Sequence, residues 1–284
     1  MGIKNILIIF SCLFIHLNLI AQDSTKVKAG GPSESELAAA NNPLADTYAV
    51  NIQDYFIPKI YGADGAYQNQ AWLRVAIPTW RILWRLSMPF STISMPDKNG
   101  NPGFHKSGIG DADLFAAFLA VMKPKITFGI GPSFGFPTSS DPRLGTGKYS
   151  AGLATVIFAA PGPKFQIGGL IIWKKSFAER PEAIYDSKQH FNVLAIQPFY
   201  FFQLGKGFYL RGAPIWTFEL TSGTFNIPLG LGVGKVAKFG PAVFNFFIEP
   251  QVTILHHGDS QPAFQVLAGM NMQFKGKSKK TKKK

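Results

Sequence analysis

One short segment of the 284-residue chain has the residue types and spacing of a catalytic nucleophile. Residues 131–135 read Gly-Pro-Ser-Phe-Gly, which places Ser133 in the pattern of a hydrolase nucleophile turn. Acids and histidines follow in the required chain order, namely Asp186, His190, His256 and Asp259. That turn must lead from a strand into a helix, but Phe136 and Pro137 follow here without helical periodicity. The glycines are better explained as one row of a strand.

Two other motifs fail on their own residues. Residues 145–148 read Gly-Thr-Gly-Lys, as in a phosphate-binding loop, but Pro142 replaces the first glycine and Tyr149 the hydroxyl residue that would bind magnesium. The histidines near the loops (His105, His190, His256 and His257) show no metal-ligand spacing with carboxylates. We therefore predict no enzymatic activity, no cofactor and no metal.

Polar side chains inside apolar runs are more informative. Residue alternation places ten of them on or near one face of predicted strands: Arg74, Arg81, Arg85, Asp113, Gln197, Arg211, Asn245, Glu249, Gln251 and Asn271. Two hypotheses remain open for them. They could form a polar constriction that selects permeants, or they could form structural ion pairs, for example Arg211 with Glu249.

The elements that position these residues follow a period of two. In residues 244–254, Phe and Ile alternate with Asn, Glu, Gln and Thr, and residues 224–234 and 262–274 repeat the pattern with glycine and amides on the polar row. A helix would interleave the two sets, whereas a strand separates them onto opposite faces. The sequence predicts about twelve strands of roughly ten residues, the length that a tilted strand needs to cross hydrocarbon. They are expected at 48–60, 70–78, 80–88, 112–121, 124–134, 149–159, 164–173, 191–202, 207–217, 224–235, 241–254 and 262–274.

The connections alternate between tight turns and longer loops. Turns are expected at 122–125, 161–163, 204–207 and 236–240, and loops at 89–111, 135–148, 174–190, 218–223 and 255–261. Aromatic residues gather at both strand ends, as in the girdles of membrane barrels. The fold predicted is an all-β, transmembrane, antiparallel up-and-down barrel with short periplasmic turns and longer extracellular loops. A soluble β-sandwich would also alternate, but it would expose charged residues on its outer faces.

The chain ends predict export. Residues 1–21 have the charged, apolar and small-residue order of a cleaved signal peptide, and Cys12, the single cysteine, lies within it. Residues 22–47 read as a periplasmic linker in which 33–40 could form a short helix. Seven lysines fall in 275–284, which we expect to be a disordered basic tail. Since this tail carries most of the net charge of +13, the charge is no indication of a nucleic-acid partner. The barrel domain is expected at 48–274.

Short motifs in order along the chain resemble the outer-membrane family named for the MetA pathway of phenol degradation. They include Asn42 to Ala45, Trp84 to Pro89, Gly108 to Asp111, Asn226 to Gly230 and Glu249 to Gln251. This resemblance implies a monomeric barrel that passes small, often aromatic or apolar, compounds across the outer membrane. It implies no catalytic residues. The ten residues after Phe274 depart from such barrels, which usually end on a terminal aromatic.

The function predicted is a passive or facilitated channel for small molecules in the bacterial outer membrane, with membrane lipids and a permeant as its partners. The alternative is a barrel with a scaffolding role that uses the basic tail and the linker. Whether the segment before Tyr48 plugs the bore is left open by the sequence.

Overall fold

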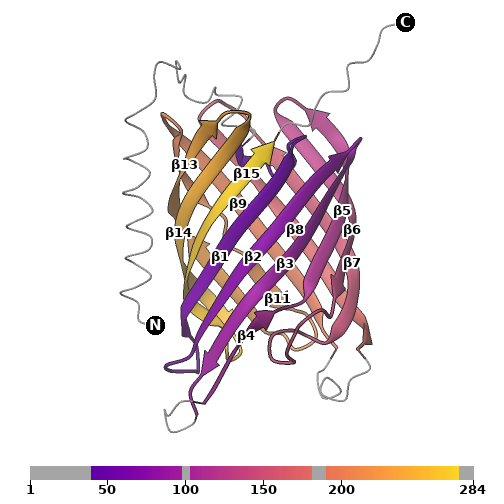
Figure 1. The fold of residues 1–284 in the computed structure, drawn as a ribbon, viewed down its shortest axis with the longest axis vertical. Helices are drawn as coiled ribbons and strands as arrows, with labels where there is room; N and C mark the ends of the chain where they lie inside the picture. Colours follow the sequence, from indigo (N-terminus) through magenta and orange to yellow (C-terminus); the bar gives the residue numbers. More distant parts are fainter. Residues whose placement is uncertain (1–39, 98–102, 181–189, 275–284) are drawn as a thin grey trace, which may run out of the picture. The chain divides into compact units, whose positions relative to one another are not determined.

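A computed structural model describes residues 40–97, 103–180 and 190–274, and its fifteen strands form one sheet (Figure 1). The strands are β1 (Tyr48–Ile60), β2 (Tyr67–Thr79), β3 (Ile82–Met95), β4 (Phe104–Ile109), β5 (Ala112–Lys123), β6 (Ile126–Phe136), β7 (Lys148–Ala159), β8 (Phe165–Glu179), β9 (Asn192–Gly205), β10 (Phe208–Gly212), β11 (Trp216–Glu219), β12 (Phe225–Gly230), β13 (Gly232–Phe239), β14 (Ala242–His257) and β15 (Pro262–Phe274).

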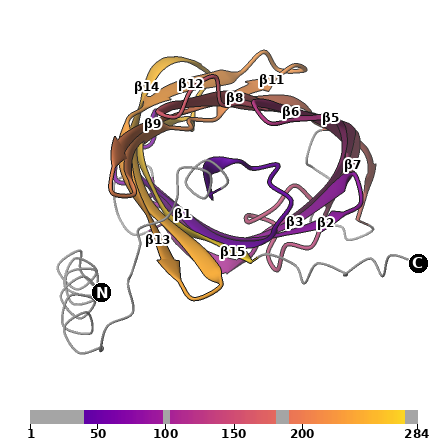
Figure 2. The same cartoon turned by 90° about the horizontal axis from the view of Figure 1, so that it is seen from above.

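Six of these strands join end to end, so that twelve antiparallel strands surround the interior. β4 and β5 both pair with β3, β10 and β11 with β9, and β12 and β13 with β14. β1 pairs with β15 from Tyr48 opposite Phe274 to Ile60 opposite Pro262, which closes the sheet into a ring (Figure 2). The prediction of a closed, all-β barrel of twelve antiparallel strands is confirmed.

The alternation of residue types explains why each strand has an outer and an inner face. On β8, Ile167, Ile171 and Trp173 are exposed on the outside, whereas Gln166 and Leu170 are buried inside. The same outward rows on the other strands carry Leu, Ile and Phe, and together they give the barrel an apolar outer belt. Such a belt is the surface that lipid requires of a membrane barrel. No helix in the described part of the chain has the length and hydropathy of a membrane span.

Turns and loops lie at opposite ends of the barrel. At one end, two-residue turns join Thr79 to Ile82, Lys123 to Ile126, Gly205 to Phe208 and Phe239 to Ala242. The chain enters β1 and leaves β15 at this short-turn end, where Tyr48 pairs with Phe274. The longer connections lie at the opposite, long-loop end.

Two predicted loops are partly wrong because the strands extend past the apolar belt. Instead of ending at 88, β3 continues to Met95 and pairs with β4, from Phe90 opposite Ile109 to Met95 opposite Phe104. β8 likewise continues to Glu179. In β3 the added residues include Phe90, Thr92 and Ile93, which favour extended backbone. In β8 the polar residues stay extended because the ladder with β7 continues to Lys148 opposite Glu179. Polarity alone therefore does not mark the end of a strand in this chain.

The described segment before β1, residues 40–47, turns into the ring instead of leaving it (indigo in Figure 2). We call it the lumen segment. The predicted signal peptide at 1–21, most of the predicted linker and its helix at 33–40, and the basic tail at 275–284 lie outside the described residues.

Candidate functional site

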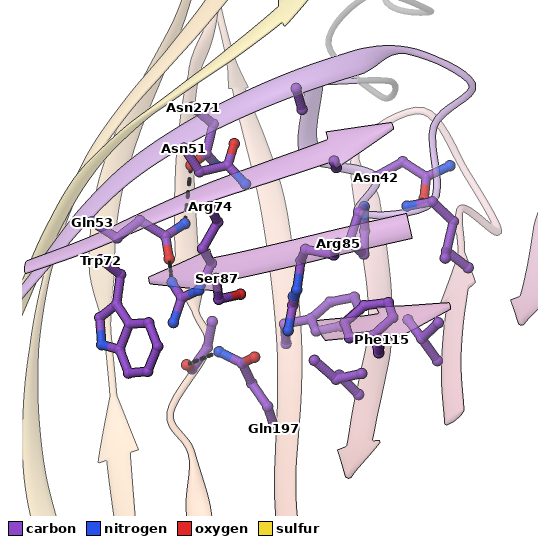
Figure 3. Close-up of a pocket in the computed structure, with 18 of the residues that line it drawn as sticks. Asn42, Asn51, Gln53, Trp72, Arg74, Arg85, Ser87, Phe115, Gln197 and Asn271 are labelled. Carbon is purple, nitrogen blue, oxygen red and sulfur yellow. Dashed lines mark hydrogen bonds between the residues drawn. The ribbon is translucent and has the colours of Figure 1, made fainter. Parts of the chain in front are cut away.

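The barrel interior holds a cavity of about 390 Å³, which is the candidate functional site (Figure 3). Side chains of β1–β3, β5–β10, β14 and β15 line it, together with the chain around Ala213 and the lumen segment. Its charged lining residues are Arg74, Arg85, Asp113, Lys174 and Arg211, and its amide lining residues are Asn41, Asn42, Asn51, Gln53, Gln197, Asn245, Asn271 and Gln273.

The structure places seven of the ten polar residues singled out from the sequence on this cavity: Arg74, Arg85, Asp113, Gln197, Arg211, Asn245 and Asn271. Glu249 and Gln251 point to the same side of β14 but are buried in the wall, with 0% and 1% of their surface exposed. The tenth, Arg81, is not a lining residue.

Arg81 lies at the short-turn end because Thr79 pairs with Ile82, which leaves it in the turn between β2 and β3. Its Nε and Nη2 donate to the carbonyls of Leu119 and Ala120, both at 3.1 Å. The guanidinium also stands 5.3 Å from the ring centre of Phe118. The sequence assigned Arg81 to a strand, and alternation loses its meaning once a residue enters a turn.

Glu249 organises a buried network on the inner wall. Its Oε2 accepts from Arg211 Nε at 2.7 Å, and its Oε1 accepts from the backbone N–H of Ala213 at 2.8 Å and from Gln251 Nε2 at 2.7 Å. Gln265 then donates to Gln251 Oε1 at 2.5 Å. The arginine and carboxylate are therefore fully paired, and this part of the lumen carries a bracing ion pair.

A second cationic group lies on β2 and β3. Arg74 Nη1 donates to Gln53 Oε1, and the Arg74 guanidinium stands 4.7 Å from the ring centre of Trp72. Arg85 stands 4.3 Å from the ring centre of Phe115. Figure 3 shows both arginines among the lining residues, with Ser87 between them. Neither forms an ion pair with a carboxylate of the described residues.

The neighbouring carboxylate, Asp113, is engaged elsewhere. Its Oδ1 forms an ion pair with Lys174 Nζ from β8. At the long-loop end, Lys148 pairs in the same way with Glu179. Each acid of the inner wall thus has its own cation; Asp113 also attracts Arg74 and Arg85, but forms an ion pair with neither.

The inner face is less polar than the alternation suggested. Buried Leu83, Phe115, Val156, Phe199 and Phe201 point inward and form one cluster with the lumen segment. Polar residues therefore do not fill the whole inner row, and these strands differ from residues 224–254, where the inner row carries amides and glycine. Bulky residues can occupy inward positions here because a barrel of this size is partly filled by side chains.

The lumen segment is held inside by both polar and apolar contacts. Asn245 Nδ2 donates to Ala40 O at 3.3 Å and to Asn41 Oδ1 at 2.9 Å, and Gln273 Nε2 donates to Ala40 O at 3.3 Å. Leu44 is only 3% exposed and packs in the apolar cluster. The sequence contains no periodic signal for this docking, since the segment has no regular strand or helix pattern.

The wall has one weakly paired junction, between the β10/β11 and β12/β13 strands. Leu210 pairs with Val233 and Thr217 pairs with Asn226, but residues 212–216 and 227–231 between those regions are not paired with each other. We call these two stretches the seam. Their free groups bond to side chains: Gln197 donates to Ala213 O, Tyr200 to Gly230 O and Trp216 to Pro228 O, at 2.9 to 3.0 Å.

Outside the seam lies an apolar groove of about 600 Å³. It is lined by Pro198, Tyr200, Pro214, Trp216, Leu229, Gly230, Leu231, Pro250, Gln251, Val252 and Phe264. Gln251 belongs to the inner row, so the groove reaches into the thickness of the wall. Each of the four neighbouring composite strands carries a proline here: Pro198 on β9, Pro214 between β10 and β11, Pro228 on β12 and Pro250 on β14. Proline cannot donate a hydrogen bond to a sheet ladder. The four prolines were a sequence signal for the seam that alternation overlooked.

At the long-loop end, two aspartates order the loop 137–147. Asp111 accepts from the backbone N–H groups of Ser139 and Thr146, at 3.2 and 2.5 Å. The backbone N–H of Arg143 donates to Asp141 Oδ1 at 2.9 Å and lowers the pKa of Asp141 below its usual value, and Lys106, 3.6 Å away, acts in the same direction.

The catalytic motifs have no supporting structure. Ser133 is buried inside β6, and its neighbours are strand residues. His190 Nδ1 lies 3.0 Å from Ser176 Oγ, and His256 stacks on Tyr61 at 3.7 Å between ring centres. Among residues 40–97, 103–180 and 190–274, no three acidic, histidine or cysteine side chains form a metal cluster.

The fold is shared with bacterial outer-membrane proteins. An outer membrane channel from Pseudomonas putida F1 superposes with a TM-score of 0.60 and 14% identity, over 80% of this chain and 94% of that one. The NanC porin superposes with a TM-score of 0.50 and 10% identity, over 80% of this chain and all of the porin. No family model matches the sequence. No curated protein matches it either.

Proposed function

We propose that the protein is an outer-membrane channel that passes small molecules with an apolar portion. The cavity inside the closed barrel carries this proposal, because it combines fixed polar groups with the inward-facing side chains of Phe115, Val156 and Phe199. Pockets of a few hundred Å³ with this mixed lining are typical small-molecule sites. The likeness of the fold to outer-membrane channels supports the proposal, as does the resemblance of the sequence motifs to transporters of the MetA pathway.

In this arrangement the short-turn end faces the periplasm and the longer loops face outward. The protein acts as a monomer, because its twelve strands close on themselves and leave no sheet edge for a second copy. The lumen segment narrows the channel from the periplasmic side.

Conductance of the refolded, signal-free chain in planar bilayers tests the proposal, together with swelling of liposomes in small neutral solutes. We expect discrete channel openings and solute-dependent swelling. Deletion of residues 40–47 should enlarge the conductance. If neither the whole chain nor this variant passes any solute, the channel proposal is wrong.

Deletion of residues 275–284 is the matched control. A channel keeps its permeability without the lysine-rich tail, whereas a scaffold that binds its partner through the tail loses that partner.

A further inference from the structure

Arg74 and Arg85 are close neighbours on the inner wall. In the β2–β3 ladder, Arg74 lies opposite Ser87 and Ala76 lies opposite Arg85, so the two arginines are diagonal neighbours on the inward face. Diagonal neighbours are about 7–8 Å apart at the backbone, within reach of long side chains. Two positive charges therefore face the same part of the cavity.

These charges lack the compensation that other cations of the barrel receive. Arg211 is paired with Glu249, Lys174 with Asp113 and Lys148 with Glu179. Arg74 has two uncharged hydrogen-bond partners, Gln53 and Tyr55, and Arg85 Nε is buried without a hydrogen-bond partner. A bracing arginine would be expected to meet an acid, as Arg211 does.

Placing two like charges side by side in a poorly hydrated wall is unfavourable without a counter-ion. Trp72 and Phe115 reduce this cost by lying against the guanidinium groups, but aromatic faces carry no net charge. Asp113 attracts both arginines but is itself paired with Lys174, so one carboxylate serves three cations and an anion in the cavity would offset the remaining positive charge.

We propose that the cavity binds a small organic carboxylate, with its charged end between Arg74 and Arg85 and its apolar body among Phe115, Val156, Leu170 and Phe199. The planar guanidinium fork matches a carboxylate in geometry. The buried hydroxyl groups of Ser87 and Ser133 also line the cavity. This inference rests on the proposed channel function and names the class of its permeant.

Three benzene derivatives that differ in charge provide the test: benzoate, benzamide and benzylamine. Isothermal titration calorimetry of the refolded, signal-free barrel in detergent measures their binding without requiring transport. We expect benzoate to bind at least ten times more tightly than benzamide, and benzylamine to show no binding. Acetate should bind at least ten times more weakly than benzoate, because it lacks the apolar body.

The variants Arg74→Gln and Arg85→Gln, alone and together, should each weaken benzoate binding, and the double variant should lose at least ten-fold in affinity. Arg85→Lys is a milder change that keeps the charge but not the fork. It should weaken benzoate binding several-fold while leaving the anion preferred over the cation. Arg81→Gln is the matched control, because Arg81 lies outside the cavity, and its affinity for benzoate should equal that of the unmodified chain.

Equal binding of benzoate and benzamide would overturn the proposal, and so would full benzoate affinity in folded Arg85→Gln or Arg85→Lys. Conductance measured in parallel separates this outcome from failure of the channel function. A barrel that conducts without preferring benzoate refutes the carboxylate site alone. A barrel that binds benzoate but passes no solute refutes the channel.

Discussion

Glu249 is the residue on which the inner wall near the seam depends. It is fully buried and accepts hydrogen bonds from Arg211, Ala213 and Gln251. Its carboxylate therefore replaces backbone partners that the interrupted strand does not supply to Ala213.

Replacing Glu249 by Ala should destabilise the barrel by about 3–5 kcal/mol, because Arg211 is left buried without its counter-ion. Urea unfolding in lipid vesicles, followed by tryptophan fluorescence, measures this change. The control is Lys106→Gln, whose exposed side chain pairs with Asp141 at the long-loop end and should leave the unfolding midpoint almost unchanged. A Glu249→Ala barrel as stable as the control would show that the network is not a brace.

At the residue scale, the sequence predicted the inward direction of Arg74, Arg85 and Asn245 because alternation alone decides the face of a strand residue. It did not predict which charges would pair. Lys174 reaches Asp113 from β8, across two strands, and that contact depends on the curvature of the closed wall. Because Asp113 pairs with Lys174, Arg74 and Arg85 have no ion-pair partner in the part of the chain that the structure describes, and no local pattern in the sequence encodes this outcome.

At the element scale, the seam is the weakest junction of the wall. We expect the amides of Ile215, which lies in no ladder, and of Gly230, whose carbonyl accepts from the Tyr200 hydroxyl at the seam, to exchange with solvent deuterium at least about ten times faster than those of mid-strand residues in β1 and β15, since backbone without a partner strand opens locally at low cost. Amide-resolved exchange by NMR in detergent micelles measures this difference. Uniform protection around the ring would contradict it.

The lumen segment is a second element with a separable role. Leu44→Ala should remove about 2–5 kcal/mol of packing, which is enough to release the segment without unfolding the wall. The expected result is a mean single-channel conductance close to that of the barrel lacking residues 40–47. Asp46→Asn is the control, because Asp46 is exposed and does not line the cavity, and its conductance should stay at the original value.

All twelve strands could be predicted because each carries its own alternation, whereas the seam and the docked segment could not. Gly212, Pro214 and Pro228 fall inside runs that alternate normally on both sides, so each composite strand was expected to be continuous. The segment 40–47 docks through partners such as Asn245, which lies 205 residues after Ala40 and 204 residues after Asn41 in the sequence. No local pattern encodes such contacts.

For the molecule as a whole, the position of the apolar outer belt predicts which outward-facing residues lie in the hydrocarbon of the membrane. Ile171→Arg, in the middle of β8, should destabilise the barrel in lipid vesicles by about 2–4 kcal/mol, because an arginine at mid-depth must leave water. Phe177→Arg, on the same outward row near the long-loop end, should cost about 0–1 kcal/mol. Equal costs at both sites would mean that the belt does not lie where hydrocarbon would cover it.

The direct continuation of residues 40–47 into β1 makes that stretch an intramolecular ligand of its own barrel. Covalent attachment gives it an effective concentration on the order of millimolar, so even weak intrinsic affinity keeps it bound. A synthetic octapeptide of the same sequence, supplied to the truncated barrel, should therefore restore the original conductance only near millimolar doses. The attachment of residues 40–47 to β1 therefore keeps them in the bore. A molecule that competes for the same place must bind tightly enough to displace a segment whose effective concentration is millimolar.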